Sequence, residues 1–137
     1  MTGGAAGTLV PPALLDLPIN YESAAQGLTL GSGGFLVCDQ GVSPVAVLRE
    51  LLVFFEHESC GRCTPCRLGI REARELLDGL IGGAGDGPAL QRLARLTNLL
   101  QTTVQCGLGI SVARPIQSAL RFFPECFQTA PAAAPGT

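Results

Sequence analysis

Four cysteines have a spacing that suits a metal cluster. Cys60, Cys63 and Cys66 follow one another at steps of three, and Cys106 stands alone farther along the chain. Three closely spaced thiolates can surround one point and leave one corner of a cuboidal cluster open, which a remote cysteine can fill. The pattern favours a 4Fe-4S cluster, with these four residues as both metal ligands and cofactor-binding residues. No residue is expected to be catalytic.

Other cysteine chemistries fit this pattern less well. Tetrahedral zinc also accepts four cysteines, although its sites usually present two separated pairs. Disulfide exchange needs a single Cys-x-x-Cys pair, usually near a thioredoxin-like βαβ pattern that this sequence lacks. A zinc-loaded or degenerate site in a non-redox docking module therefore stays open as the alternative. Cys38 and Cys126 are interpreted as inert buried thiols outside the site, without an assigned role.

The residues beside the cysteines suggest how a cluster would be held and tuned. Gly61 gives the backbone freedom to wrap around it, and Pro65 marks where a helix begins. Backbone amides and the positive dipole end at that helix start favour a reduced, more negative cluster. Arg62 and Arg67 either add to this effect or are ordinary solvated charges. Four cysteines complete the ligand set, so His57 is expected on the surface or just beyond the ligands.

The elements that must position these cysteines are helices. Ser43-Pro44 supplies an N-cap and a first-turn proline, and Thr64-Pro65 repeats this start signal. Apolar residues then recur at steps of three and four, which is the period of a helix with one buried face. Pro115 is tolerated because it falls near a helix start. The predicted helices span 45–57, 64–80, 88–100 and 111–123.

The residues before the first helix lack a helical period. Prolines make residues 1–18 an irregular lead-in, a short helical turn is expected over 20–25, and the apolar run 35–39 predicts one buried strand. The Ala-Pro-rich end predicts a disordered tail over 128–137.

Composition and charge restrict the class of protein. The chain has 137 residues, 47% of them hydrophobic, so it should fold around a core. A formal net charge of -2 offers no basic surface for nucleic acid. The N-terminus lacks a signal-peptide pattern, and no window reaches the ~18 uninterrupted apolar residues of a membrane span. We therefore expect a cytoplasmic protein without membrane insertion, either free or peripheral to a membrane complex.

The sequence around the cysteines resembles the NADH-binding flavoprotein subunit of respiratory complex I. That superfamily also includes diaphorase subunits of NAD-linked hydrogenases and formate dehydrogenases, which the resemblance does not separate. The similarity covers roughly residues 3–127 and holds all four cysteines. The segments that carry it are 57–67, 106–109, 113–115 and 122–125, with 14–23 and 30–34 upstream.

The resemblance implies a mainly α fold. Residues 43–127 would form a four-helix cluster-binding bundle, preceded by a partial β-grasp (α+β) segment at 1–42. It implies that the chain passes single electrons from a flavin, reduced by NADH, to further iron-sulfur centres. The partners would be a flavin- and NADH-binding protein or domain and other iron-sulfur subunits.

FMN and NAD are expected on a partner or missing domain and not on this chain. The glycine-rich run 31–34 precedes a strand instead of following one and opening a helix, so it lacks the context of a phosphate-binding loop. The chain is thus expected to be a component of an NADH dehydrogenase-type oxidoreductase, and an independent NADH-oxidising enzyme ranks behind both other interpretations.

Overall fold

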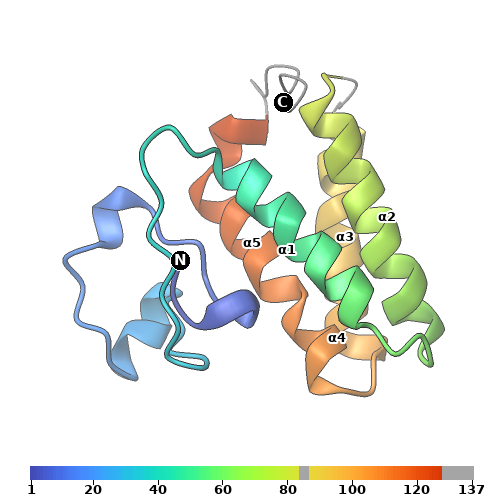
Figure 1. Cartoon of the computed structure of the whole chain (residues 1–137), viewed down its shortest axis with the longest axis horizontal. Helices are drawn as coiled ribbons and strands as arrows, with labels where there is room; N and C mark the ends of the chain where they lie inside the picture. Colours follow the sequence, from blue (N-terminus) through green and yellow to red (C-terminus); the bar gives the residue numbers. More distant parts are fainter. Residues whose placement is uncertain (84–86, 128–137) are drawn as a thin grey trace.

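The structure is a computed structural model that describes residues 1–83 and 87–127 and places a helical bundle beside an irregular N-terminal segment (Figure 1). The mainly α fold class is therefore confirmed. The tail predicted over 128–137 lies outside the described residues. The α-helices of the described part are α1 (Pro44–Glu58), α2 (Thr64–Ile81), α3 (Gly87–Thr103), α4 (Gly107–Ser111) and α5 (Ala113–Phe122).

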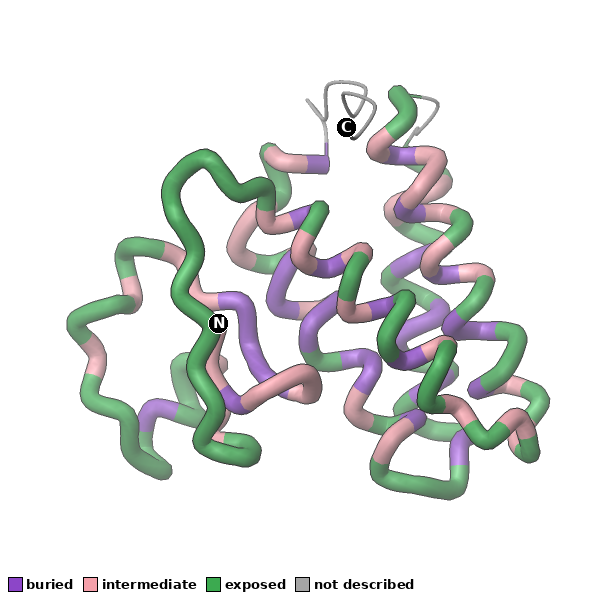
Figure 2. Tube along the Cα trace, in the orientation of Figure 1, coloured by how far each residue is buried: buried purple, intermediate pink, exposed green. Residues whose placement is uncertain are grey.

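Four of these helices enclose the hydrophobic core. Helix α1 packs on α2, α2 on α3, α3 on α5, and α5 returns to α1, while the short α4 contacts both α3 and α5. Figure 2 shows the buried positions along the inward sides of the helices. The fully buried aliphatic side chains of the core include Leu48, Leu52, Ile70, Leu77, Leu93, Leu100, Val112 and Ile116.

Local sequence explains where the first helices begin. Pro44 and Pro65 each occupy the first turn of a helix, where a missing amide proton costs no intrahelical hydrogen bond. Helix α1 then buries Val45, Leu48, Leu52 and Phe55, which recur at the predicted three- and four-residue steps. The predicted starts and periods of α1 and α2 are confirmed.

Helices α2 and α3 come close together at a glycine. A Cβ atom on Gly69 would lie 3.1 Å from Leu100 Cδ2, so only a residue without a side chain fits there unless Leu100 moves. This contact lies near the start of α2 and near the end of α3. It therefore brings the chain that follows α3, including Cys106, back toward the start of α2.

The fourth predicted helix, 111–123, corresponds to α5, and the short helix α4 that precedes it was not predicted. Helix α4 ends at Ser111, and α5 begins at Ala113 after Val112. Pro115 has no amide proton, so it cannot donate to the Ser111 carbonyl as a continuous helix would require. The proline is in the first turn of α5, as expected, but it also separates α5 from α4.

The N-terminal segment contains short 3₁₀ turns, namely η1 (Gly4–Ala6), η2 (Pro12–Leu14) and η3 (Glu22–Gln26). The irregular lead-in and the turn expected over 20–25 are therefore confirmed. The strand predicted at 35–39 is wrong: in the described residues this stretch contributes a single bridge, between Thr2 and Phe35. Val37 is 92% exposed. An apolar run can form a buried strand only if a neighbouring strand pairs with it along its length, and in residues 1–83 and 87–127 none does.

The correction extends to Cys38, which lies in this stretch. Its side chain is exposed, so its interpretation as a buried thiol was wrong. Figure 2 shows the same exposure along the whole stretch from Gly31 to the start of α1.

The N-terminal segment packs on the bundle through Leu9. This side chain is 5% exposed and joins the hydrophobic core, and its amide donates a 3.0 Å hydrogen bond to Ser118 Oγ on α5. The proposed division into 1–42 and 43–127 stays a prediction. Within the described ranges, none of the helices combines the length and hydropathy that a membrane-spanning segment needs.

Candidate metal centre

The four candidate ligands belong to two connections at one end of the bundle (Figure 1). Cys60 and Cys63 lie between α1 and α2, and Cys66 is in the first turn of α2. Cys106 directly precedes α4. Among the described residues all cysteines are free thiols, so no disulfide competes for these sulfurs.

The connection between α1 and α2 turns sharply at Gly61. This residue has a φ of +75°, a left-handed conformation that glycine adopts without steric cost. Cys63 follows as the N-cap of α2 with extended backbone, and its carbonyl accepts a 3.0 Å hydrogen bond from the Arg67 amide. The expected roles of Gly61 in turning the chain and of Pro65 in starting the helix therefore agree with the geometry.

Cys66 lies directly against α4. A Cβ atom on Gly109 would lie 3.2 Å from Cys66 Sγ and 3.0 Å from Val104 Cγ2. Glycine at this position allows the α4 backbone to approach the start of α2, and α4 is preceded at once by Cys106. The structure thus brings the remote cysteine to the same end of the bundle as the other three.

The four thiols differ in their exposure. Cys66 is 5% exposed. Cys63 is half-buried, whereas Cys60 and Cys106 are exposed. As the side chains stand, no three His, Cys, Asp or Glu residues of the described part are close enough together to hold a metal ion. Neighbouring connections are therefore brought together, but the sulfurs themselves are not gathered around one point.

Ser59 is a polar neighbour of the buried thiol. Its Oγ lies 3.6 Å from Cys66 Sγ, within hydrogen-bonding distance for sulfur, and it accepts a 3.4 Å hydrogen bond from the Gly61 amide. Residue 59 comes directly after the end of α1, so this contact depends on how the connection folds back over the first turn of α2.

The charged residues near the cysteines have different surroundings. Arg62 and Arg67 are exposed, and within the described part of the chain neither forms an ion pair. His57 is also exposed, with Nδ1 3.1 Å from Glu58 Oε1. These positions agree with the expectation that His57 lies on the surface.

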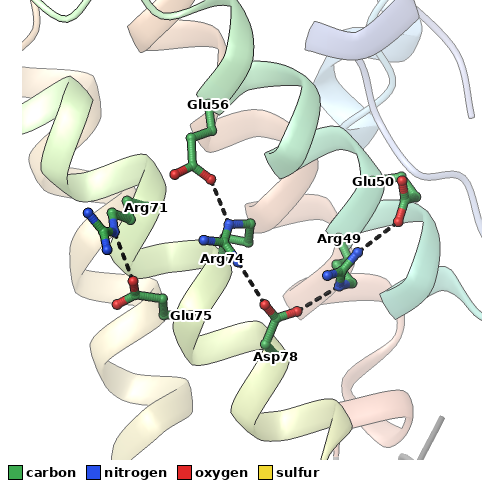
Figure 3. A network of polar contacts seen from close by, with 7 residues as sticks. All are labelled: Arg49, Glu50, Glu56, Arg71, Arg74, Glu75 and Asp78. Atoms are coloured by element: carbon green, nitrogen blue, oxygen red, sulfur yellow. Dashed lines mark hydrogen bonds and ion pairs between the residues drawn. The ribbon is translucent and has the colours of Figure 1, made fainter. Parts of the chain in front are cut away.

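Glu56 takes part in a network of ion pairs between α1 and α2 (Figure 3). Arg74 Nε donates to Glu56 Oε2 at 2.6 Å, and Arg74 Nη1 donates to Asp78 Oδ2 at 2.9 Å. Asp78 also accepts from Arg49 Nε at 2.7 Å. The hydrogen bond to Asp78 raises the pKa of Arg49, and the hydrogen bond to Glu56 raises the pKa of Arg74. The network joins the two helices that flank the cysteine connection.

Cys126 is half-buried in η4 (Pro124–Phe127), and burial and the neighbouring Glu125 raise its pKa. The shift disfavours the thiolate form of Cys126. A separate hollow of about 700 Å³ lies along the N-terminal segment and α1 and is lined by residues such as Leu9, Leu36 and Val47. None of the four candidate ligands lines it.

Sequence reasoning missed Ser59, Val104 and Gly109. The second glycine of Cys106-Gly107-Leu108-Gly109 was a visible signal of close packing, but its neighbour could not be identified without the tertiary structure. Ser59 gave no signal, because a serine that follows a helix is usually a surface residue.

Comparison with protein families matches residues 46–130 to the NADH-ubiquinone oxidoreductase-F iron-sulfur binding region. The NADP-reducing hydrogenase subunit HndC of Solidesulfovibrio fructosivorans is 40% identical over 123 residues, which cover 89% of this chain and 25% of that relative. An NADH-quinone oxidoreductase subunit of Rickettsia typhi is 33% identical over 122 residues, covering 88% of this chain and 29% of the relative. The chain thus spans about a quarter of the length of these relatives.

Solved structures include a similar fold. A chain in the crystal structure of an NAD+-reducing [NiFe]-hydrogenase in the H2-reduced state superposes with a TM-score of 0.84 and 29% sequence identity. The match covers 96% of this chain and 22% of the hydrogenase chain. The similarity therefore includes the N-terminal segment as well as the bundle.

Proposed function

Because the chain belongs to the family of NADH-ubiquinone oxidoreductase-F iron-sulfur binding regions, we propose that it is an electron-transfer module with one 4Fe-4S cluster on Cys60, Cys63, Cys66 and Cys106. The observation that carries the proposal is the position of Gly109, whose absent side chain lets α4, directly preceded by Cys106, lie against Cys66. When bound, such a cluster takes up and releases one electron at a time.

The donor set suits this cofactor. Four thiols from two neighbouring connections can supply the four thiolates that a cubane cluster requires, and in the described residues none is held in a disulfide. Cys66 is fixed by the packing of α4 and α2, whereas the side chains of Cys60 and Cys106 are exposed. Loading therefore requires the side chains of Cys60 and Cys106 to turn toward Cys66.

The residues around the site would stabilise added negative charge. The first-turn amides of α2 point toward the N-terminal end of that helix, and in the described structure no side chain caps them. Arg62 and Arg67 add positive charge, and neither is in an ion pair within the described ranges. Exposure of Cys60 and Cys106 leaves this end of the bundle accessible to an electron donor or acceptor.

The proposed direction of electron flow follows the name of the NADH-quinone oxidoreductase relative. The names of the two relatives describe subunits of NADP-reducing hydrogenase and NADH-quinone oxidoreductase, of which the matched region makes up 25% and 29%. We infer that electrons arrive from a flavin reduced by NADH on a partner or on a further domain, and leave to iron-sulfur centres of other subunits. FMN and NAD are thus assigned to that partner or domain.

Metal analysis with electron paramagnetic resonance tests this proposal. The full chain is purified anaerobically, its iron and zinc are measured, and spectra are recorded before and after dithionite. Cys106→Ser removes one proposed ligand, and Cys38→Ser is the matched control because Cys38 is an exposed thiol in the N-terminal segment. We expect about four irons per chain and a signal of the reduced cluster, both lost or weakened in Cys106→Ser but unchanged in Cys38→Ser.

Two outcomes would contradict the proposal. Stoichiometric zinc without a redox signal in a folded sample would instead support the structural docking module. A cluster that survives unchanged in Cys106→Ser would exclude this residue as the fourth ligand.

A further inference from the structure

We propose that the Ser59 hydroxyl donates a hydrogen bond to the Cys66 sulfur when Cys66 is a thiolate ligand, and that this bond raises the reduction potential of the site. The inference rests on the proposed function and deepens it, because it names a residue outside the ligand set that sets the electron affinity of the cluster. Ser59 acts through Cys66 and is therefore a positioning residue.

The hydrogen-bonding capacity of Ser59 determines the direction of the bond. Ser59 Oγ lies 3.6 Å from Cys66 Sγ and already accepts a 3.4 Å hydrogen bond from the Gly61 amide. A serine hydroxyl has one proton to donate, and a thiolate has none. Once Cys66 is deprotonated, the hydroxyl must therefore be the donor and the sulfur the acceptor.

Cys66 is the ligand at which one hydrogen bond should matter most. Its side chain is buried, whereas the side chains of Cys60 and Cys106 are exposed. A hydrogen bond is electrostatically stronger in a buried, low-dielectric environment. Among the described residues, Cys66 is also the only one of the four candidate ligands with a side-chain hydrogen-bond partner.

The sign of the effect follows from charge. One added electron makes the ligand sulfurs more negative, so a donated hydrogen bond stabilises the reduced state more than the oxidised state. No covalent bond forms or breaks, and the hydroxyl proton stays on Ser59. Removal of the hydroxyl should therefore lower the potential, so that a stronger reductant is needed.

The experiment compares the full wild-type chain with Ser59→Ala, Ser59→Thr and Ser111→Ala. Ser59→Ala removes the hydroxyl, whereas Ser59→Thr keeps it. Ser111→Ala is the matched control at the same end of the bundle, because Ser111 Oγ donates to the Leu108 carbonyl within α4 and has no bond to a candidate ligand. Iron content, the midpoint potential from a paramagnetic redox titration and the hyperfine coupling of exchangeable deuterons in D₂O are measured for each.

We expect Ser59→Ala to bind iron as the wild type does but to have a lower potential. At a fixed applied potential, its ratio of reduced to oxidised cluster should fall about tenfold. For a one-electron couple this corresponds to a midpoint potential that is lower by about 59 mV. One exchangeable deuteron coupling should also disappear. Ser59→Thr should restore both quantities, and Ser111→Ala should match the wild type.

The readouts separate failure of this inference from failure of the proposed function. Wild-type chain without iron would overturn both, whereas iron-loaded wild type without a strong deuteron coupling would overturn the role of Ser59 alone. An unchanged potential in Ser59→Ala would also overturn it. If Ser59→Ala failed to fold, the wild-type coupling and the potential of Ser59→Thr would still decide the question.

Discussion

Cys66 is the candidate ligand that the protein holds in place before any cofactor binds. Its thiol is enclosed by the first turn of α2, the backbone of α4 and the side chain of Ser59. Cys60 and Cys106 instead have exposed side chains on connections. At the residue scale, the proposed site therefore consists of one fixed sulfur and other sulfurs that must move toward it.

Gly109 is the residue whose replacement should test this packing. Gly109→Ala places a Cβ atom 3.0 Å from Val104 Cγ2 and 3.2 Å from Cys66 Sγ. We expect a loss of about 1–3 kcal/mol in the free energy of unfolding through overpacking, partly offset by the helix preference of alanine. Iron loading should fall as α4 moves away. Urea unfolding and iron analysis measure the two effects.

Gly107→Ala is the control for this prediction. In the described structure nothing lies within 4 Å of the Cβ position of Gly107, so its substitution should leave stability and iron content unchanged or slightly raised. Equal effects of the two substitutions would show that close packing at Gly109 is unimportant.

At the element scale, α1 and α2 are linked by two ion pairs of Figure 3, Arg49 with Asp78 and Arg74 with Glu56. Asp78 is central, because it accepts hydrogen bonds from both Arg49 and Arg74. The three side chains are between 24% and 39% exposed, so solvent weakens each pair. Their combined effect should nevertheless help to fix the two helices that flank the cysteine connection.

Asp78→Asn should weaken this association. The substitution removes the charge that two arginines share, and we expect the free energy of unfolding to fall by about 1 kcal/mol. The loss should shrink at high salt, because ions screen the pairs. Urea unfolding at low and high salt measures both quantities.

Glu75→Gln is the matched control for Asp78→Asn. It breaks the exposed pair between Arg71 and Glu75, which lies within α2 alone, and should cost only about 0.3–0.5 kcal/mol. Equal costs for the two variants would argue against a contribution of Asp78 to helix association.

At the scale of the whole molecule, the N-terminal segment and the bundle are joined by a buried hydrogen bond. The Leu9 amide donates to Ser118 Oγ, and these residues are far apart in the sequence. Leu9 also contributes its side chain to the bundle core. The segment is therefore anchored on α5, although it contains no strand among its described residues.

Ser118→Ala should loosen this anchor. Without the hydroxyl the Leu9 amide is left buried and unpaired, which costs about 1–3 kcal/mol. We expect faster hydrogen exchange at the amides of Thr8 and Leu9, with α1–α3 protected as in the wild type. Ser111→Ala loses only a bond within its own helix and should leave exchange at these amides unchanged. Slow exchange in both variants would mean that Leu9 is held by its side chain alone.

The sequence by itself determined α1, α2, α3 and α5 and the candidate ligands. Helical period and start signals depend on neighbouring residues, so α1, α2 and the role of Pro65 could be predicted from short segments. Cys60, Cys63 and Cys66 also form a local pattern. Cys106 is near them only because α3 packs against α2 and leads the chain back toward the start of α2. The family resemblance that these segments carried was confirmed by the comparisons.

Only the tertiary structure decided which side chains meet. The strand at 35–39 was wrong because strand formation needs a paired neighbour that an apolar run does not specify. The contacts of Cys66 with Gly109 and Ser59 were not predictable either, since they depend on how three helices pack and on how one connection folds over α2. Short-range patterns thus specify elements, whereas contacts between residues distant in sequence follow from the packing of the whole chain.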